Sequence, residues 1–378
     1  MKLARIQIHK YKSCLETELA LHEDLTVLIG VNGAGKTNIM TAVNLLSLMS
    51  QTHFTMFPAD KETEVSFLFV DPDWSVELRV KSSGELRPEL SWRMADILDQ
   101  YVQVPLYFVQ SDDVEKNSRA VKNYFDVLNM DISTEKITRF TSRMLKTKTF
   151  IESIRYYSAV QFSDVTKVVP HIQKEAKTPR EQFLQDLFNM RNDFPEKYTR
   201  YRELVGPEEI HLVDDISFKG YMQFSEYMDS GNSPAKNEDS ELWMPLVTIN
   251  NRELRFNQLS EGTFKTLALL FYITAHDGGL LLLEEPEISV HYKLLKDIIE
   301  IIKNESENKQ ILCSTHSDYV LDMLDPEMVV LVKNGRRGTK AAALPSALSE
   351  ENDQGLRTFL ECEGSLGEYW KAGSFDEA

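Results

Sequence analysis

The first fifty residues place a glycine-rich turn between apolar segments. Residues 3–8 and 25–29 have the composition of strands, and the second is a continuous apolar run that stops at Gly30. From Lys36 onward, apolar residues recur at the spacing of one helix face. The pattern predicts a buried strand, a loop and a helix in that order.

The middle of the chain has two different patterns. From about 64 to 93, polar and apolar residues alternate, which is typical of a strand meander or hairpin. From about 114 to 230, apolar residues follow helical spacing, and loop-forming residues then fill 230–240. We expect an antiparallel sheet followed by a mostly helical insertion.

After residue 240, strand and helix patterns alternate. We expect strands at 245–249, 280–283 and 310–313, and helices at 263–274 and 292–303. Strands that alternate with helices are typical of a parallel α/β sheet. The expected fold class is therefore α/β, with a mixed sheet core, an antiparallel β subdomain and a mostly helical insertion.

Composition limits the partners and the compartment. The 378 residues carry a formal net charge of −17, so any nucleic-acid contact needs a local basic patch. The three cysteines, Cys14, Cys313 and Cys362, show no C-x-x-C spacing, which argues against a disulfide framework or a structural zinc site. No apolar run approaches the ~20 residues of a membrane span. We expect a cytoplasmic protein without membrane contact.

The glycine-rich turn has the spacing Gly30-x-x-x-x-Gly35-Lys36-Thr37. In a P-loop of this spacing, backbone N–H groups hold phosphates, the lysine neutralises their charge and the threonine hydroxyl binds magnesium. The alternative is a glycine turn with an unrelated Lys-Thr pair, which the flanking strand and helix disfavour. The predicted ATP-binding residues of this segment are Gly30, Asn32, Gly33, Gly35, Lys36, Thr37 and Asn38.

Two adjacent carboxylates, Glu284 and Glu285, follow the apolar strand at 280–283. Ligands of open α/β sheets collect at the carboxyl ends of the strands. We assign Glu284 to magnesium, through water, and Glu285 to the attacking water of a phosphoryl transfer. The alternative, a solvated acidic turn, is the weaker interpretation in a chain with a P-loop.

Two further motifs allow a structural and a functional interpretation. Ser260-Glu261-Gly262 precedes an apolar helix, where Ser260 suits an N-cap, and a capped helix N-terminus is itself an anion site. His316 follows the strand at 310–313, and a lone histidine in such a place is more often structural. The context of the other motifs favours a functional role for both.

The order of these motifs resembles that of ABC-type ATPases, whose fold is the ABC-type P-loop NTPase. The resemblance implies that Ser260 and Gly262 of one subunit cap the γ-phosphate bound by the P-loop of another, in a head-to-tail homodimer with ATP between the subunits. It also makes His316 the switch histidine, which contacts the γ-phosphate. The implied parts are an N-terminal lobe at 1–113, the insertion at 114–240 and a C-terminal lobe at 241–378.

The implied magnesium ligands are Thr37, Glu284 and a Q-loop glutamine. Gln161 is the first candidate for this glutamine and Gln110 the alternative, and an exposed structural role fits either of them equally well. Glu284 departs from the aspartate that is usual at its position. The longer side chain puts the geometry of the metal site in doubt.

Within the superfamily, the chain resembles the RecF/SMC/OLD-like soluble branch of AAA-type predicted ATPases. The similarity rests on the opening segment 6–13, on Asn38 after the P-loop, on 284–287, on 315–317 and on the closing segment 366–373. No heptad pair flanks a C-x-x-C hook, and no D-x-D cluster follows His316. Any nuclease or toxin chemistry is therefore expected on another chain.

Basic residues gather in three groups. We expect solvated helix faces for the first two and a hairpin turn for the last. Any of the three is a candidate contact for DNA or a protein partner in an ATP-bound dimer. The groups are Arg143, Lys146 and Lys148; Arg191, Lys197, Arg200 and Arg202; and Lys333, Arg336, Arg337 and Lys340.

Three functions follow from the resemblance. The first is an ATPase that serves as sensor or regulatory subunit of an anti-phage defence or toxin–antitoxin-like system with a separate effector, similar to the AriA type of the PARIS system. The second is a RecF-like DNA-repair ATPase that clamps DNA. The third is a nucleotide-gated scaffold with negligible turnover.

Overall fold

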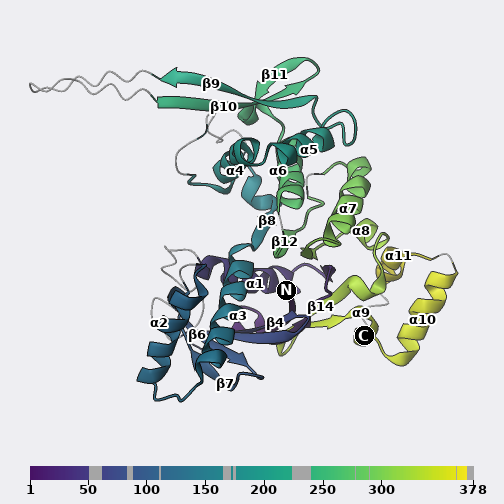
Figure 1. Cartoon of the computed structure of the whole chain (residues 1–378). Coiled ribbons are helices and arrows are strands. Elements are labelled where there is room, and N and C mark those ends of the chain that lie inside the picture. The colour runs from purple at the N-terminus through teal and green to yellow at the C-terminus, as the bar shows by residue number, and fades with distance from the viewer. Residues whose placement is uncertain are drawn as a thin grey trace, which may run out of the picture. The chain divides into compact units, whose positions relative to one another are not determined.

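The chain passes back and forth between two units in the computed structural model (Figure 1). The first unit contains Met1–Tyr156, Asp277–Pro286 and Ile299–Ala378, and the second contains Tyr157–His276 and Glu287–Ile298. The expected division at 113 and 240 stays a prediction. The structure describes residues 1–50, 62–82, 88–109, 112–164, 172, 176–223, 240–276, 278–288, 290–362 and 364–372.

An antiparallel sheet of the first unit confirms the predicted meander. In β4 and β5 every second residue is buried, and the register places Phe67 opposite Leu78 and Phe69 opposite Val76. One face of the sheet therefore packs into the core. The strands, in sheet order, are β2 (Cys14–Ala20), β1 (Lys2–Tyr11), β4 (Glu64–Asp71), β5 (Trp74–Lys81), β6 (Glu89–Met94) and β7 (Leu98–Gln103).

A second, mixed sheet contains the predicted buried strands. β14, β3, β13 and β12 are parallel to one another, and β15 is antiparallel to β14. β3 and β13 are buried at every residue, as expected for strands covered on both faces. The order is β15 (Gly338–Ala343), β14 (Val329–Gly335), β3 (Leu25–Ile29), β13 (Gln310–Ser314), β12 (Leu280–Glu284) and β8 (Arg155–Ser158).

The helices of the first unit begin where capping residues permit. Asp113 caps α2 and Ser133 caps α3, each through a side-chain oxygen that accepts a backbone N–H. α2 and α3 lie side by side (Figure 1). The helical elements are α1 (Lys36–Ser50), η1 (Leu106–Phe108), α2 (Val114–Val127), α3 (Thr134–Glu152), α8 (Asp318–Leu321), η5 (Pro326–Met328), α9 (Leu344–Ala347), α10 (Glu350–Glu361) and α11 (Leu366–Lys371).

The second unit packs helices around buried aromatic rings. Phe183 makes edge-to-face contacts with Phe162, Phe264 and Phe271 at centroid distances of 5.3 to 6.5 Å. The elements are η2 (Ala159–Phe162), α4 (Pro179–Asp193), α5 (Pro195–Val205), β9 (Asp215–Gln223), β10 (Ser240–Ile249), β11 (Arg252–Arg255), η4 (Phe256–Gln258) and α6 (Glu261–Ala275). α7 (Tyr292–Ser306) begins in this unit and ends in the first.

The stretch from 114 to 230 is mostly helical, as expected, but it also contains the strand β9, which the sequence pattern did not lead us to expect. It pairs with β10 over its whole length in an antiparallel sheet with β11. Ile216 and Phe218 alternate with polar residues, which is a strand pattern that the helical interpretation of 114–230 leaves out. Most of the expected loop at 230–240 lies outside the described residues. Within the described part of the chain, no helix combines the length and apolar character needed to cross a bilayer.

Candidate functional site

Three glycines give the P-loop its shape. Gly33 and Gly35 have φ values of +80° and +108°, a region that residues with side chains rarely adopt. An added Cβ at Gly30 would lie 2.2 Å from Val332 O, and one at Gly35 would lie 2.1 Å from Thr339 Oγ1. Strands β14 and β15 therefore approach the loop too closely for any other residue at these two positions. A Cβ at Gly33 would meet open space, so glycine is needed there for its positive φ and not for lack of room.

Lys36 begins α1 and its side chain folds back over the loop. The residue is 5% exposed. Its Nζ donates a hydrogen bond to Gly30 O at 2.9 Å and lies 2.8 Å from His316 Nε2. A bound phosphate would attract this ammonium, which is held close to the loop's backbone.

Glu285 and His316 reach the site from adjacent parallel strands. β12 and β13 pair so that Glu284 lies opposite Ser314, and the Glu285 N–H donates to Ser314 O at 3.0 Å. Glu285 has a φ of +47°. This left-handed conformation costs about 1–2 kcal/mol for a residue with a side chain, and such strain clusters at functional sites.

The imidazole of His316 lies between two charged groups. Nε2 lies 3.0 Å from Glu285 Oε1 and 2.8 Å from Lys36 Nζ. A nitrogen with no proton accepts from the ammonium, whereas a protonated one donates to the carboxylate, and it cannot do both at once. Nδ1 also lies 3.4 Å from Lys36 Nζ, so a ring with its proton on Nε2 can donate to Glu285 and accept from Lys36 through Nδ1.

The P-loop is supported from β15 by a chain of hydrogen bonds. Asn38 Nδ2 lies 2.6 Å from Ser13 Oγ, which lies 2.8 Å from Thr339 Oγ1, and Thr339 Oγ1 lies 3.1 Å from Ala34 O. Because a carbonyl only accepts, Thr339 donates to Ala34, so Ser13 donates to Thr339 and accepts from Asn38. Sequence reasoning missed Thr339, because 305 positions separate it from Ala34.

Thr37 and Glu284 carry oxygens of the kind that magnesium prefers. Thr37 and Asn32 are exposed, and Glu284 is half-buried at the end of β12. Mg²⁺ usually takes one or two protein oxygens and completes its shell with phosphate oxygens and water. These two residues fit an ion that binds together with a nucleotide. No group of three or more His, Cys, Asp or Glu among the described residues could hold a metal by itself.

Glu284 has a protein partner that the sequence did not indicate. Tyr156 on β8 donates a hydrogen bond from its hydroxyl to Glu284 Oε2. The two residues are 128 positions apart, and no local pattern marks the tyrosine. β8 and β12 are neighbours in the mixed sheet, which brings the two side chains together.

Three predicted site residues belong to the second unit. Ser260 is the exposed N-cap of α6, and its Oγ accepts a hydrogen bond from a backbone N–H at 3.1 Å. Gly262 lies in the first turn of that helix, and Gln161 lies in η2. The alternative glutamine, Gln110, is outside the described residues. The roles of these residues at the nucleotide stay predictions.

The first basic group is not the solvated helix face that we expected. Arg143 has a side chain only 9% exposed, and its Nη2 donates to Asp96 Oδ2 at 2.8 Å. This hydrogen bond is the main reason why the pKa of Asp96 is lowered. The guanidinium of Arg143 and the ammonium of Lys146 lie 5.2 and 5.6 Å from the ring centroid of Trp74. Lys148 pairs with Glu152 at 3.4 Å.

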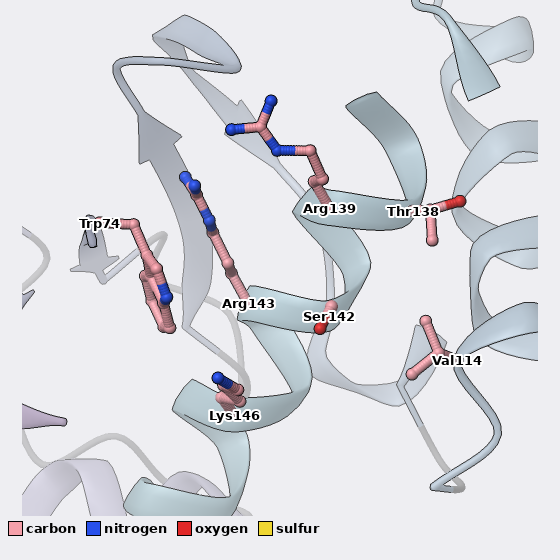
Figure 2. A pocket seen from close by; sticks show the side chains of 7 residues that line it. All are labelled: Trp74, Val114, Thr138, Arg139, Ser142, Arg143 and Lys146. Carbon is pink, nitrogen blue, oxygen red and sulfur yellow. The ribbon is translucent and has the colours of Figure 1, made fainter. Parts of the chain in front are cut away.

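Trp74, Arg143 and Lys146 line a pocket of about 300 Å³ (Figure 2). Arg139, Arg143 and Lys146 project from successive turns of α3, and Trp74 faces them from the start of β5. Asp96 pairs with both arginines. The residues that line the pocket include three cations and no carboxylate. The pocket is therefore a local positive site on an acidic protein.

The other two basic groups have different surroundings. In the second group, Arg191 lies over the rings of Phe218 and Trp243, and Arg202 pairs with Asp215 at 2.5 Å. The third group lies on the β14–β15 hairpin, as predicted. Arg191 and Arg202 of the second group therefore already have partners within the second unit.

Comparisons with known proteins agree with the fold and the P-loop. The sequence matches the family described as "AAA ATPase domain" over residues 1–197, which is more than half of the chain. It also matches the family described as "AAA domain, putative AbiEii toxin, Type IV TA system" over residues 224–322.

Two known proteins are similar in sequence. The "Retron Ec83 probable ATPase" of Escherichia coli is 23% identical over 92% of this chain and 74% of that protein. The "DNA replication and repair protein RecF" of Lactococcus lactis subsp. cremoris (strain MG1363) is 27% identical over 36% of this chain and 40% of that protein.

A solved structure confirms the predicted fold class. The crystal structure of an SMC head bound to the C-terminal winged-helix domain of ScpA aligns with a TM-score of 0.55 and 14% identity, over 94% of this chain and 99% of that chain. The fold is thus an α/β P-loop NTPase of the SMC-head type, with a mixed sheet and an antiparallel β subdomain. A P-loop ATPase domain implies ATP binding, and the P-loop lies within the first match. The chain belongs to the family of AAA ATPase domains.

Proposed function

We propose that this chain hydrolyses ATP at the site formed by the P-loop, Glu285 and His316. The observation that carries the proposal is the position of His316 Nε2, 2.8 Å from Lys36 Nζ and 3.0 Å from Glu285 Oε1. A lysine suited to phosphate and a carboxylate suited to water are thereby joined through one imidazole.

Each residue has a defined task in the proposed reaction. Backbone N–H groups of the loop and Lys36 hold the β- and γ-phosphates. Glu285 orients the water that attacks the γ-phosphorus and accepts its proton, while the bond from that phosphorus to the β–γ bridging oxygen breaks and ADP leaves with the electron pair. Thr37, and Glu284 through water, would hold magnesium, and the ion would supply positive charge against the phosphates. Once phosphate attracts Lys36, His316 Nε2 can donate toward the γ-phosphate.

A second copy of the chain completes the site in this proposal. Ser260 is exposed at the N-terminus of a 15-residue helix, where orphan N–H groups and the helix dipole favour an anion. Ser260 and Gly262 of one copy cap the γ-phosphate bound by the other copy. Gln161, or Gln110 in its place, would be the Q-loop glutamine of this proposal.

The hydrolysis is tested by measuring phosphate release by the purified chain and by Lys36→Ala. We expect the wild type to release phosphate only with Mg²⁺. In the variant, the rate should fall at least about 100-fold, because the ammonium that contacts the β- and γ-phosphates is lost. Unchanged turnover in Lys36→Ala would mean that the P-loop is not the site. Tight ATP binding without turnover by the wild type would favour the nucleotide-gated scaffold.

The proposed biological role is that of sensor or regulatory subunit in an anti-phage defence system with a separate effector chain. This role is supported by the match to the family described with "Type IV TA system" and by the similarity to a retron ATPase. Purification of the chain from cells that express its neighbouring genes tests it. Copurification of a nuclease or a toxin supports the role. The role is opposed if the chain purifies alone and the products of the neighbouring genes have no effect on it.

DNA clamping of the RecF kind is a second candidate function, favoured by the cationic pocket around Trp74. Phosphate groups pair with clustered lysine and arginine, and an indole can stack on bases. Lys146→Glu should weaken DNA binding and reduce its salt dependence, whereas Lys148→Glu serves as a control from the same helix. Equal binding by both variants would rule out a role of the pocket in DNA binding.

A further inference from the structure

Tyr156 connects the hydrophobic core of the first unit to Glu284. Its half-buried ring packs against the core cluster, which includes Leu280 and Leu282 on β12. Its hydroxyl donates to Glu284 Oε2. The position of the hydroxyl is therefore set by the packing of the ring and by the pairing of β8 with β12 in the sheet.

Glutamate at position 284 needs such a partner more than the usual aspartate would. Its side chain has one more rotatable bond, so its carboxylate can occupy more positions and loses more entropy when it is fixed. The bond from Tyr156 occupies Oε2 and restricts this freedom. Oε1 is then the oxygen that is available to accept from a metal-bound water.

We propose that Tyr156 is a positioning residue that holds Glu284 ready for magnesium. The inference rests on the proposed ATPase function. Tyr156 touches neither nucleotide nor metal in this account and acts only through the carboxylate. Partners of this kind around a metal ligand typically change metal affinity by 10–100-fold when they are removed.

Tyr156→Phe tests the proposal, because it removes the hydroxyl and keeps the ring. Binding of a fluorescent ATP analogue to the full chain is titrated with MgCl₂, in a Glu285→Gln background that prevents turnover. We expect the Mg²⁺ concentration for half-maximal effect to rise roughly 10-fold, while affinity in EDTA stays unchanged. Tyr101→Phe is a matched control, because Tyr101 makes the same kind of bond, to Glu77 Oε2 at 2.5 Å, on the antiparallel sheet.

A double-mutant cycle separates positioning from general damage. In a Glu284→Ala background, Tyr156→Phe should leave the Mg²⁺ dependence unaltered, because the group through which it acts is gone. A second background, Glu284→Asp, should also suppress the effect, since the shorter side chain withdraws the carboxylate from the tyrosine. A Tyr156→Phe effect of full size in either background overturns the proposal.

Failure of this inference differs from failure of the ATPase function. If binding depends on Mg²⁺, Lys36 and Glu284 but Tyr156→Phe keeps the wild-type Mg²⁺ dependence, only the role of Tyr156 is wrong. If the wild type shows no Mg²⁺-dependent binding, or if binding survives Lys36→Ala, the proposed nucleotide site itself is wrong.

Discussion

His316 Nε2 lies 3.0 Å from Glu285 Oε1, and this contact exists because their strands, β13 and β12, are parallel neighbours. The imidazole therefore lies between the carboxylate proposed to activate water and the ammonium proposed to bind phosphate. His316→Ala should therefore reduce kcat by about 10²–10³-fold, the range expected for loss of one positioned donor. ATP affinity should change much less. Steady-state kinetics separate the effect on kcat from the effect on KM. A rise in KM at constant kcat would mean that His316 only binds the nucleotide.

The composite site predicts a dimer that depends on ATP and on Ser260. Glu285→Gln with Mg-ATP should elute as a dimer in size-exclusion chromatography with light scattering. Adding Ser260→Arg should return it to the monomer, because the long side chain blocks the N-terminus of α6. ATP binding by the monomer should persist, since the P-loop is untouched. An ATP-induced dimer that tolerates Ser260→Arg would contradict this geometry.

Thr339 is predicted to stabilise the P-loop through its hydroxyl. Thr339→Val keeps the shape of the side chain but removes the donor to Ala34 O and the acceptor of the Ser13 hydroxyl. Unsatisfied buried polar groups cost about 1–3 kcal/mol each, so the melting temperature should fall. Thr339→Ser retains the hydroxyl and should restore most of the loss. Equal melting temperatures of the valine variant and the wild type would show that the chain of bonds contributes nothing.

Asp96 predicts a pH dependence of stability. Its pKa is lowered in the folded state, mainly by the hydrogen bond from Arg143, so its contribution is present above the pKa of the unfolded state, near 4, and is lost as the pH falls through the lowered folded value. Because the Asp96 side chain is 46% exposed, solvent screening reduces the contribution to about 1 kcal/mol or less. Asp96→Asn should lower the melting temperature at pH 7, and this loss should shrink as the pH falls below about 4. A larger loss of melting temperature at low pH than at pH 7 would contradict the pairing of Asp96 with Arg143.

Local patterns in the sequence predicted much of the fold. The apolar run at 25–29, the helix from Lys36, the meander and the alternating strands and helices after 240 are all confirmed. These elements have a periodicity that is set by burial of one face or of the whole strand. The strand β9 was missed because it follows the helices α4 and α5 in a stretch that has mostly helical spacing.

Contacts between distant segments were beyond the reach of local patterns. The P-loop spacing located Lys36, but nothing near it indicated Thr339, whose strand excludes a side chain at position 35. Likewise, Glu284 and Glu285 were found from their place after a strand, whereas Tyr156 was not. Such partners depend on which strands become neighbours in the sheet, and this order is a property of the tertiary structure.

The most direct test of the account compares phosphate release by the wild type and by Glu285→Gln at saturating Mg-ATP, with nucleotide binding measured on the same samples. The account predicts that the variant binds ATP about as tightly as the wild type and releases phosphate at least about 100-fold more slowly, because only the group that orients and deprotonates water has changed. Equal rates of phosphate release from the two proteins would contradict it.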